Sequence, residues 1–367
     1  MSLETNPQAK TYSKIKYRLF FVSTLLSGLF LLAVLATGLS AWFVQYLINW
    51  QFSKWLLVAM YAGIGYTFMD VIFLPLSFYS GYILEHRFQL SNMTLGAWVW
   101  DHIKGFLISI VFSVIALEVL YLFLGFFPET WWIWTFCAWL FFSFVLGKLT
   151  PILLLPIFYK IEPLENPSLK ERLLNLATVV NAKILGVYKM DMSKKTKKAN
   201  AMFTGIGNTK RIILGDTLLA NFTEEEIEVI LAHEMGHYYY KHIMMQLVFS
   251  AVLFLTGLLL VNKIIYSLMP VFGFVTIQDV AAFPLFSLVL SAFFLITMPW
   301  VNSFSRACEK AADRFALIHT KNKLAFISSM EKLAKQNLAD PCPPRWIEWL
   351  LYSHPSIQHR IEMAQKF

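Results

Sequence analysis

The sequence predicts a mainly α-helical, polytopic membrane protein with about six transmembrane helices and a smaller part outside the membrane. Of the 367 residues, 57% are hydrophobic and 16% are aromatic, while only 15% are charged. Soluble domains carry about 25% charged residues, and one or two globular cores could not bury so much apolar surface. The composition also excludes a disordered chain. The net charge of +8 therefore indicates membrane topology and a lipid bilayer with anionic headgroups as partner, rather than nucleic acid.

Six apolar runs have the roughly 17–25 residues needed to cross a bilayer. The first covers residues 19–43; it exceeds a signal-peptide core of roughly 7–15 residues, so we expect a retained spanning helix. The other runs lie near residues 55–79, 106–127, 131–159, 243–266 and 283–300. They divide the chain into a four-helix membrane region (1–159), a soluble segment (160–242), two further spans (243–300) and a C-terminal helical segment (301–367).

In this arrangement most Lys and Arg residues lie on one side of the membrane. Six spans place both termini on one side, and 28 of the 31 Lys and Arg residues lie there. They comprise 4 in residues 1–18, 2 in the loop with Arg87 and Lys104, 12 in residues 160–241 and 10 in residues 306–366. The positive-inside rule therefore predicts cytoplasmic termini and a cytoplasmic soluble segment.

Local signals predict the elements of the soluble segments. Residues 168–180 read as a helix with an apolar stripe, and residues 211–214 as a short strand, so a small β element is expected. Thr223 begins a further helix with a capping box, because Glu226 stands at its third position. Residues 301–367 read as helical, with an interruption at 340–344. The three cysteines are isolated, which argues against disulfides or a thiolate zinc site.

The helix begun at Thr223 contains His233-Glu234-Met235-Gly236-His237, an H-E-x-x-H pattern. Histidines four residues apart face the same way on a helix, so His233 and His237 can bind one Zn²⁺. Glu234 can then serve as the general base that activates water. The alternative is a pair of surface histidines on a charged helix.

A third metal ligand has to come from another part of the chain. Glu309 is the best candidate, and Asp313 lies four residues later on the same helical face, where it could accept the free ring N–H of a ligating histidine. The alternative is an ordinary pair of acids on a helix. His242 is nine residues past His233, so a continuous helix would point it to the opposite side. We therefore interpret it as an interfacial residue beside the three tyrosines at 238–240.

H-E-M-G-H at 233–237, followed after two more apolar runs by E-K-A-A-D at 309–313, resembles the type I CAAX prenyl proteases. These are integral-membrane zinc metalloproteases of the endoplasmic reticulum with bacterial relatives. Five further blocks are similar to this family: residues 82–94, 156–165, 200–203, 210–219 and 349–360. The resemblance covers about residues 60–367 in order. It implies a gluzincin-like metalloprotease domain with one Zn²⁺, in a bacterial inner membrane or the endoplasmic reticulum.

The resemblance also implies roles for individual residues. Zinc would be bound by His233, His237 and Glu309, and Glu234 would activate water. An extended substrate would pair with the strand at Asn200-Ala201, His354 would hydrogen-bond the oxyanion, and Arg360 would hold Asp313. The implied substrate is a prenylated or other membrane-associated peptide, cut after the prenylated cysteine.

Two other functions remain open on the sequence. One is an HtpX-like zinc protease that acts on damaged membrane proteins, a reading that the blocks at 82–94 and 353–355 disfavour. The other is a transporter or scaffold whose histidines merely bind metal, for which repeated halves would be expected and are not found in the sequence.

The sequence departs from the family pattern in two ways. Eukaryotic members have seven spans around a large chamber, whereas six are counted here, so we expect the N-terminal span to be missing. Met202-Phe203 stands where the family prefers an aromatic pair. Three ionisable residues fall inside the predicted spans, namely Asp70, Glu118 and Lys148. They either face a water-filled chamber or form a buried pair or snorkel.

Overall fold

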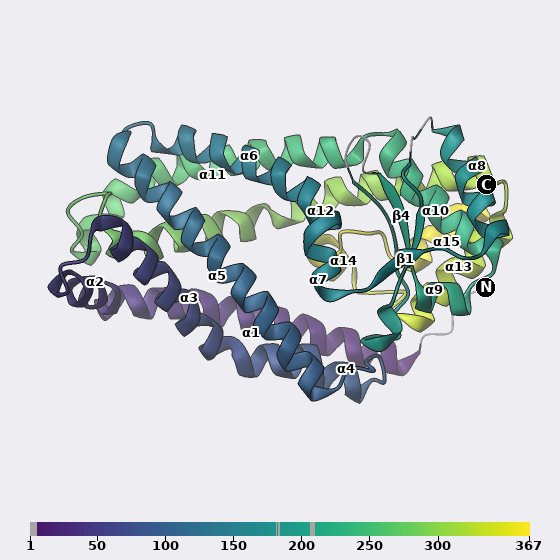
Figure 1. Cartoon of the computed structure of the whole chain (residues 1–367), viewed down its shortest axis with the longest axis horizontal. Coiled ribbons are helices and arrows are strands. Elements are labelled where there is room, and N and C mark those ends of the chain that lie inside the picture. Colours follow the sequence, from purple (N-terminus) through teal and green to yellow (C-terminus); the bar gives the residue numbers. More distant parts are fainter. Residues whose placement is uncertain (1–5, 181, 183, 206–209) are drawn as a thin grey trace.

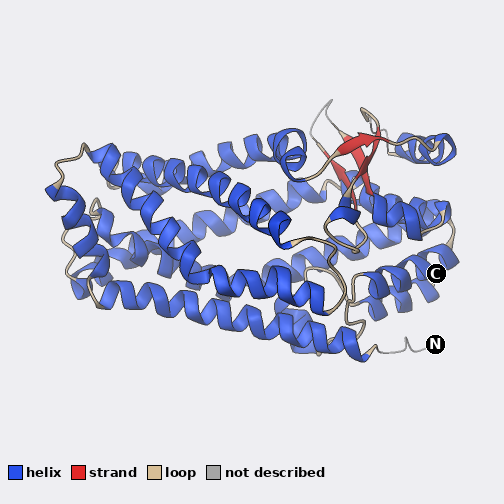
Figure 2. Cartoon of the chain, turned by 60° about the horizontal axis from the view of Figure 1, so that its bottom comes forward, coloured by secondary structure: helices blue, strands red, loops and turns tan. Residues whose placement is uncertain are grey.

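The computed structural model describes residues 6–180, 182, 184–205 and 210–367. Long helices run side by side over most of its length, and the sheet with its surrounding helices occupies one end (Figure 1). Both termini lie at the sheet end, and the short helix α2 (Leu39–Asn49) lies at the opposite end. Figure 2 shows the strands grouped together at one edge of this end of the molecule.

Six helices in the described part are long and apolar enough to cross a membrane, which confirms the predicted class. They are α1 (Pro7–Ala36), α3 (Lys54–Phe78), α5 (Leu95–Phe126), α6 (Trp131–Leu149), α11 (His242–Leu268) and α12 (Phe283–Thr320). A π-helical turn, η1 (Tyr79–Ile83), joins α3 to α4 (Leu84–Arg87), and η2 (Thr150–Leu154) joins α6 to α7 (Leu155–Phe158). Two 3₁₀ turns, η5 (Met269–Phe272) and η6 (Val280–Ala282), lie between α11 and α12.

The first helix differs from its predicted range of 19–43. It begins at Pro7, because the side chain of Asn6 caps the first turn and proline suits that position. It ends at Ala36, because Gly38 takes a left-handed conformation (φ 68°) and a new helix, α2, starts after it. The basic N-terminal stretch is therefore helical, and its Tyr12 is buried against α4.

The elements outside the spans are short. The strands are β1 (Ile161–Pro163), β2 (Val187–Met190), β3 (Ala201–Thr204) and β4 (Arg211–Gly215), and the helices are α8 (Pro167–Val179), η3 (Met192–Lys194), α9 (Asp216–Asn221), α10 (Glu224–Tyr239), α13 (Lys323–Gln336), α14 (Arg345–Leu351) and α15 (Ile357–Gln365). The predicted helix at 168–180 and strand at 211–214 are confirmed as α8 and β4. The predicted capping box of Thr223 and Glu226 is present in α10.

The four strands form one sheet in the order β1-β2-β4-β3. β2 and β4 run parallel, whereas β1 and β3 pair antiparallel with their neighbours, Ala201 opposite Leu214. Strand β3 is thus at an edge of the sheet, and its Phe203 ring lies 5.3 Å from the ring of Tyr238 on α10. One apolar core holds the sheet to α8, α10, α12, α13 and α15.

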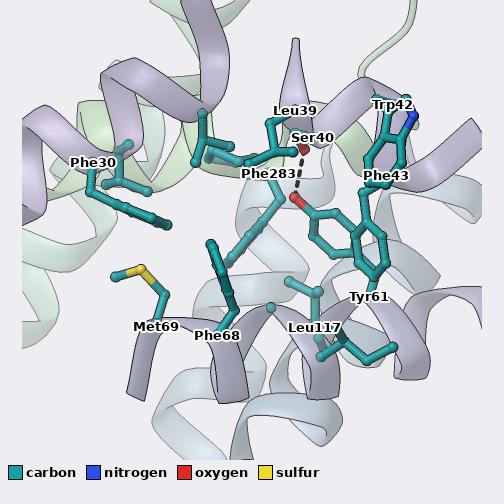
Figure 3. Close-up of a pocket in the computed structure, with 16 residues that line it drawn as sticks. Phe30, Leu39, Ser40, Trp42, Phe43, Tyr61, Phe68, Met69, Leu117 and Phe283 are labelled. Atoms are coloured by element: carbon teal, nitrogen blue, oxygen red, sulfur yellow. Dashed lines mark hydrogen bonds between the residues drawn. The ribbon is translucent and has the colours of Figure 1, made fainter. Parts of the chain in front are cut away.

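A second apolar core lies in the other half of the molecule, between the spanning helices. It contains a cavity of about 360 Å³ lined almost wholly by apolar side chains from α1, α2, α3, α5 and α12. Figure 3 shows its aromatic walls, which include Phe30, Phe68 and Phe283. The two hydroxyl groups that line this cavity are both hydrogen-bonded. The hydroxyl oxygens of Tyr61 and Ser40 lie 2.7 Å apart, and the Ser40 hydroxyl donates to the carbonyl of Ala281.

Candidate active site

The site is built where α10 crosses α12. The apolar run of α12 was predicted to end at residue 300, but the helix continues without a break to Thr320 and so carries Glu309 and Asp313 to α10. Gly236 permits the close approach, because a Cβ there would lie 2.9 Å from the Cα of Ala312. The glycine of the H-E-M-G-H sequence therefore sets the distance between the two histidines and Glu309.

Three potential metal ligands converge at this crossing: His233, His237 and Glu309. The two histidine Nε2 atoms are 3.1 Å apart. Glu309 reaches His233 with Oε2 at 3.2 Å and His237 with Oε1 at 3.3 Å. The sequence predicted this grouping from three residues spread over two helices, and the fold brings the three together.

The chemistry of this group fits a bound metal ion. Oε2 of Glu309 is buried and has no hydrogen-bond partner among the described residues, a costly arrangement unless a cation satisfies it. Ligands at about 2.0–2.2 Å around a tetrahedral zinc lie roughly 3.3–3.5 Å from one another, close to the spacings found here. Burial alone would lower the pKa of His233, but the hydrogen bond to Asp313 and the nearby Glu309 raise it to about 9. The group thus favours positive charge at its centre.

Asp313 and Arg360 support the first histidine. The Nδ1–H of His233 donates to Oδ1 of Asp313 at 2.8 Å, so that a metal ion would take the place of the proton that the raised pKa puts on Nε2. Arg360, on α15, donates from Nε to Oδ2 of Asp313 at 2.8 Å. All three side chains are buried, so the guanidinium compensates the carboxylate. The contact between Arg360 and Asp313 is the one the resemblance implied.

A cavity of about 270 Å³ opens beside the cluster and is lined in part by Glu234, His237, Glu309 and His354. Burial at the cavity wall raises the pKa of Glu234 above its usual value, which suits a group that takes up a proton. Nε2 of His354 lies 3.2 Å from Oε1 of Glu309, and its side chain is 56% exposed. The lining also includes the aromatic side chains of Phe203 and Tyr238 and the imidazole of His242.

The predicted substrate strand is close to this cavity. Ala201 opens β3, and Asn200 precedes it and accepts a hydrogen bond from the backbone of Gly215. Phe203 of the same strand lines the cavity. Since β3 is an edge strand, its outer backbone groups lie on the side away from β4.

The interpretation of His242 as an interfacial residue on the far side of the helix is wrong. The helix is not continuous, because α10 ends at Tyr239 and Lys241 takes a left-handed conformation (φ 57°) before α11 begins. His242 is 4% exposed, and its Nδ1 lies 3.0 Å from Nδ1 of His237. Sequence reasoning missed this residue, since no glycine or proline marks the break.

The ionisable residues inside the spans lie apart from this cluster. Asp70 pairs with His102 of the neighbouring helix α5, with Oδ2 3.1 Å from Nε2. Glu118 is half-buried, and its Oε2 has no hydrogen-bond partner among the described residues. Lys148 is exposed in the last turn of α6. The three cysteines are free, in agreement with the absence of a predicted disulfide framework.

Comparison with known proteins now identifies the family. Residues 163–367 match the model of peptidase family M48, and residues 1–160 match the model of the CAAX prenyl protease N-terminal region with five membrane helices. The chain belongs to peptidase family M48. It is therefore a multi-pass membrane metalloendopeptidase that is similar to the CAAX prenyl proteases. Within the described part of residues 1–160, four helices of spanning length and the shorter α2 correspond to that N-terminal region.

Individual relatives agree with this family membership. The chain is 30% identical to an uncharacterized metalloprotease, YhfN, of Bacillus subtilis over 98% of this chain and 85% of that protein. It is 32% identical to the probable CAAX prenyl protease 1 of Schizosaccharomyces pombe over 68% of this chain, but spans only 53% of that protein. The crystal structure of Ste24p from S. mikatae superposes with a TM-score of 0.88 at 23% identity, over 98% of this chain and 88% of that one, and so shares the fold.

Proposed function

We propose that this M48 protein is a zinc endopeptidase that cuts prenylated, or similarly membrane-anchored, extended peptides at the cytoplasmic face of its membrane. The observation that carries the proposal is the convergence of His233, His237 and Glu309 beside a cavity that also contains Glu234 and His354. Glu309 contacts both imidazoles, one with each oxygen, and its buried Oε2 has no hydrogen-bond partner among the described residues, which supports metal binding rather than a structural ion pair.

The proposed mechanism assigns one task to each side chain. A zinc ion held by the two histidines and Glu309 would act as a Lewis acid when bound. Glu234 takes the proton from the attacking water and passes it to the leaving amine, a role that its raised pKa supports. His354, hydrogen-bonded through Nδ1 to Ser353, donates from Nε2 to the oxyanion of the tetrahedral intermediate.

The substrate would bind as an added strand on β3. Backbone hydrogen bonds to an edge strand hold a peptide extended without regard to its sequence, and β3 starts at Ala201, two residues before Phe203, which lines the cavity. Side chains of the peptide would meet Phe203 and Tyr238. The prenylated cysteine itself is proposed from the relatives named CAAX prenyl protease.

The direct test is cleavage of a farnesylated C-a-a-X peptide by the purified protein in detergent, with the metal content measured on the same sample. We expect about one zinc per chain and cleavage after the modified cysteine. Glu234→Gln should keep the metal and lose activity by roughly 10²–10⁴-fold. Full turnover by Glu234→Gln, or a protein that takes up no zinc, would overturn the proposal.

A parallel assay with an unprenylated, unfolded membrane protein separates the proposed function from the quality-control protease. Preferential cleavage of the prenylated peptide supports the CAAX-type function, whereas preference for the unprenylated protein supports the HtpX-like alternative.

The proposed orientation rests on the charge distribution and has its own test. In a cysteine-free background, Lys194→Cys on the soluble side and Lys54→Cys at the start of α3 provide matched positions. An impermeant maleimide added to sealed inside-out vesicles should label the first and spare the second. The reverse pattern would contradict a cytoplasmic site.

A further inference from the structure

The joint between α10 and α11 turns a histidine back toward the metal cluster. A single residue in the left-handed region, Lys241, separates the C-terminal turn of α10 from His242 at the start of α11. This break in the helix lets the rings of His237 and His242, five residues apart, come to 5.1 Å between centroids. On a continuous helix, residues five apart would diverge by about 140°.

The ring of His242 is held in place from several sides. It is 4% exposed, and the ring of Tyr240 stacks on it at 5.5 Å between centroids. Tyr240 in turn contacts Phe315 of α12 edge-to-face. A buried imidazole so confined requires a hydrogen-bond partner, and the partner is His237, at 3.0 Å between the two Nδ1 atoms.

The direction of this hydrogen bond decides whether His237 can bind a metal. Two Nδ1 atoms at hydrogen-bond distance share one proton, and a neutral imidazole carries a single N–H. If His237 donates through Nδ1–H, its Nε2 keeps a lone pair for the cluster with His233 and Glu309. If His242 donated instead, the proton of His237 would have to lie on Nε2, where it would exclude a metal ion.

We infer that His242 is a positioning residue that accepts the Nδ1–H of His237 and thereby fixes the metal-binding tautomer and the ring orientation of that ligand. This inference rests on the metal binding in the proposed function. It gives the two histidine ligands different partners, a carboxylate backed by Arg360 for His233 and a neutral imidazole for His237. The second partner brings no added charge to the site.

Two substitutions separate positioning from packing. Asparagine places Oδ1 as many bonds from Cα as Nδ1 of histidine and so keeps an acceptor, whereas phenylalanine keeps the ring and loses the acceptor. We expect His242→Phe to weaken zinc binding roughly 10–100-fold, and His242→Asn to restore most of that loss. A packing role would give the opposite order.

A third substitution acts through the backbone alone. Lys241→Val disfavours the left-handed conformation, because a β-branched side chain crowds the backbone there, whereas Lys241→Gly accepts it. We expect the valine variant to weaken zinc binding and the glycine variant to leave it unchanged, although neither alters the ring of His242.

The experiment is zinc competition with a chromophoric chelator on the full-length protein in detergent after metal removal. Peptide cleavage is not needed, and the melting temperature of the metal-free variants checks that they fold. His86→Phe serves as a control. His86 is a half-buried histidine, and the carbonyl of Tyr82 is its hydrogen-bond partner among the described residues. A wild-type protein without zinc affinity would refute the proposed function. Unchanged zinc affinity in His242→Phe, or equal losses in His242→Phe and His242→Asn, would refute only the role of His242.

Discussion

Two cavities of this protein differ in size and in chemistry. The larger, about 360 Å³, lies among the spanning helices, and its hydroxyl groups on Ser40 and Tyr61 are paired with each other (Figure 3). The smaller, about 270 Å³, lies at the crossing of α10 and α12. Phe283 lines the first and Glu309 the second, and 26 residues of the same helix, about 39 Å, separate them.

The comparison teaches that converging imidazole and carboxylate groups distinguish the candidate active site better than cavity volume does. Hydrocarbon walls with satisfied hydroxyl groups offer only apolar contact. At the smaller cavity Oε2 of Glu309 is buried without a hydrogen-bond partner among the described residues, 3.2 Å from Nε2 of His233, while Oε1 lies 3.3 Å from Nε2 of His237. Such an arrangement is costly to maintain, so its presence indicates a function that compensates the cost.

The largest difference between the cavities should come from removing a polar group from each. Glu309→Gln should abolish metal binding. It should also raise the activation free energy of peptide cleavage by several kcal/mol, which lowers peptidase activity on the order of 10³-fold or more. Ser40→Ala should leave both unchanged. Metal content and initial rates measure the effects. Retention of zinc by Glu309→Gln would break the comparison.

The next effect concerns two glycines, Gly236 at the contact between α10 and α12 and Gly65 at the apolar cavity. Gly236→Ala forces a Cβ against the backbone of Ala312, so we expect α10 and α12 to separate, at a cost of about 1–3 kcal/mol in stability, and zinc binding to weaken. Gly65 lines the apolar cavity, and the Cβ of an alanine at this position would meet no atom within 4 Å. That variant should be as stable as the wild type or more so. Thermal unfolding and zinc competition test both, and a harmless Gly236→Ala would contradict the close approach.

Two histidine–carboxylate pairs allow a third test. Asp313→Asn removes the charge that supports His233, and we expect roughly 10–100-fold weaker zinc binding. Asp70→Asn alters the pair with His102 on the spanning helices and should leave zinc binding unchanged. Chelator competition on both variants is the measurement. Equal losses would show that the two pairs are coupled.

The smallest effect is expected for Tyr61→Phe at the apolar cavity. It removes one hydrogen bond to Ser40, worth about 0.6 kcal/mol between membrane helices, and leaves Ser40 bonded to the carbonyl of Ala281. Unfolding in detergent should detect the change, with unaltered cleavage rates. A large loss of activity would show that the apolar cavity takes part in the reaction.

Much of the site could be predicted because it depends on local helical geometry. The spacing of His233 and His237 places both on one face of α10, and the capping box at Thr223 marks where that helix begins. Glu309 was predicted from its position just after the last span. Its contact with the histidines, however, depends on how far α12 continues, and hydropathy alone ends that helix at residue 300.

The part that could not be predicted depends on backbone breaks without a sequence signal. Lysine rarely adopts positive φ, so nothing at Lys241 indicates the joint that redirects His242. The start of α1 is the opposite case, because Asn6-Pro7 is a typical capping sequence, but the polarity of the residues that follow hid the helix.

The uninterrupted course of α12 fixes the distance along its axis between the end of its apolar run and Glu309. An α-helix does not stretch appreciably, so the nine residues from Trp300 to Glu309 fix a height of about 14 Å along the helix axis. One inserted residue in this stretch would turn Glu309 by about 100°. The number of residues in this one segment of α12 therefore sets both how far Glu309 lies from the end of the apolar run and in which direction its side chain points.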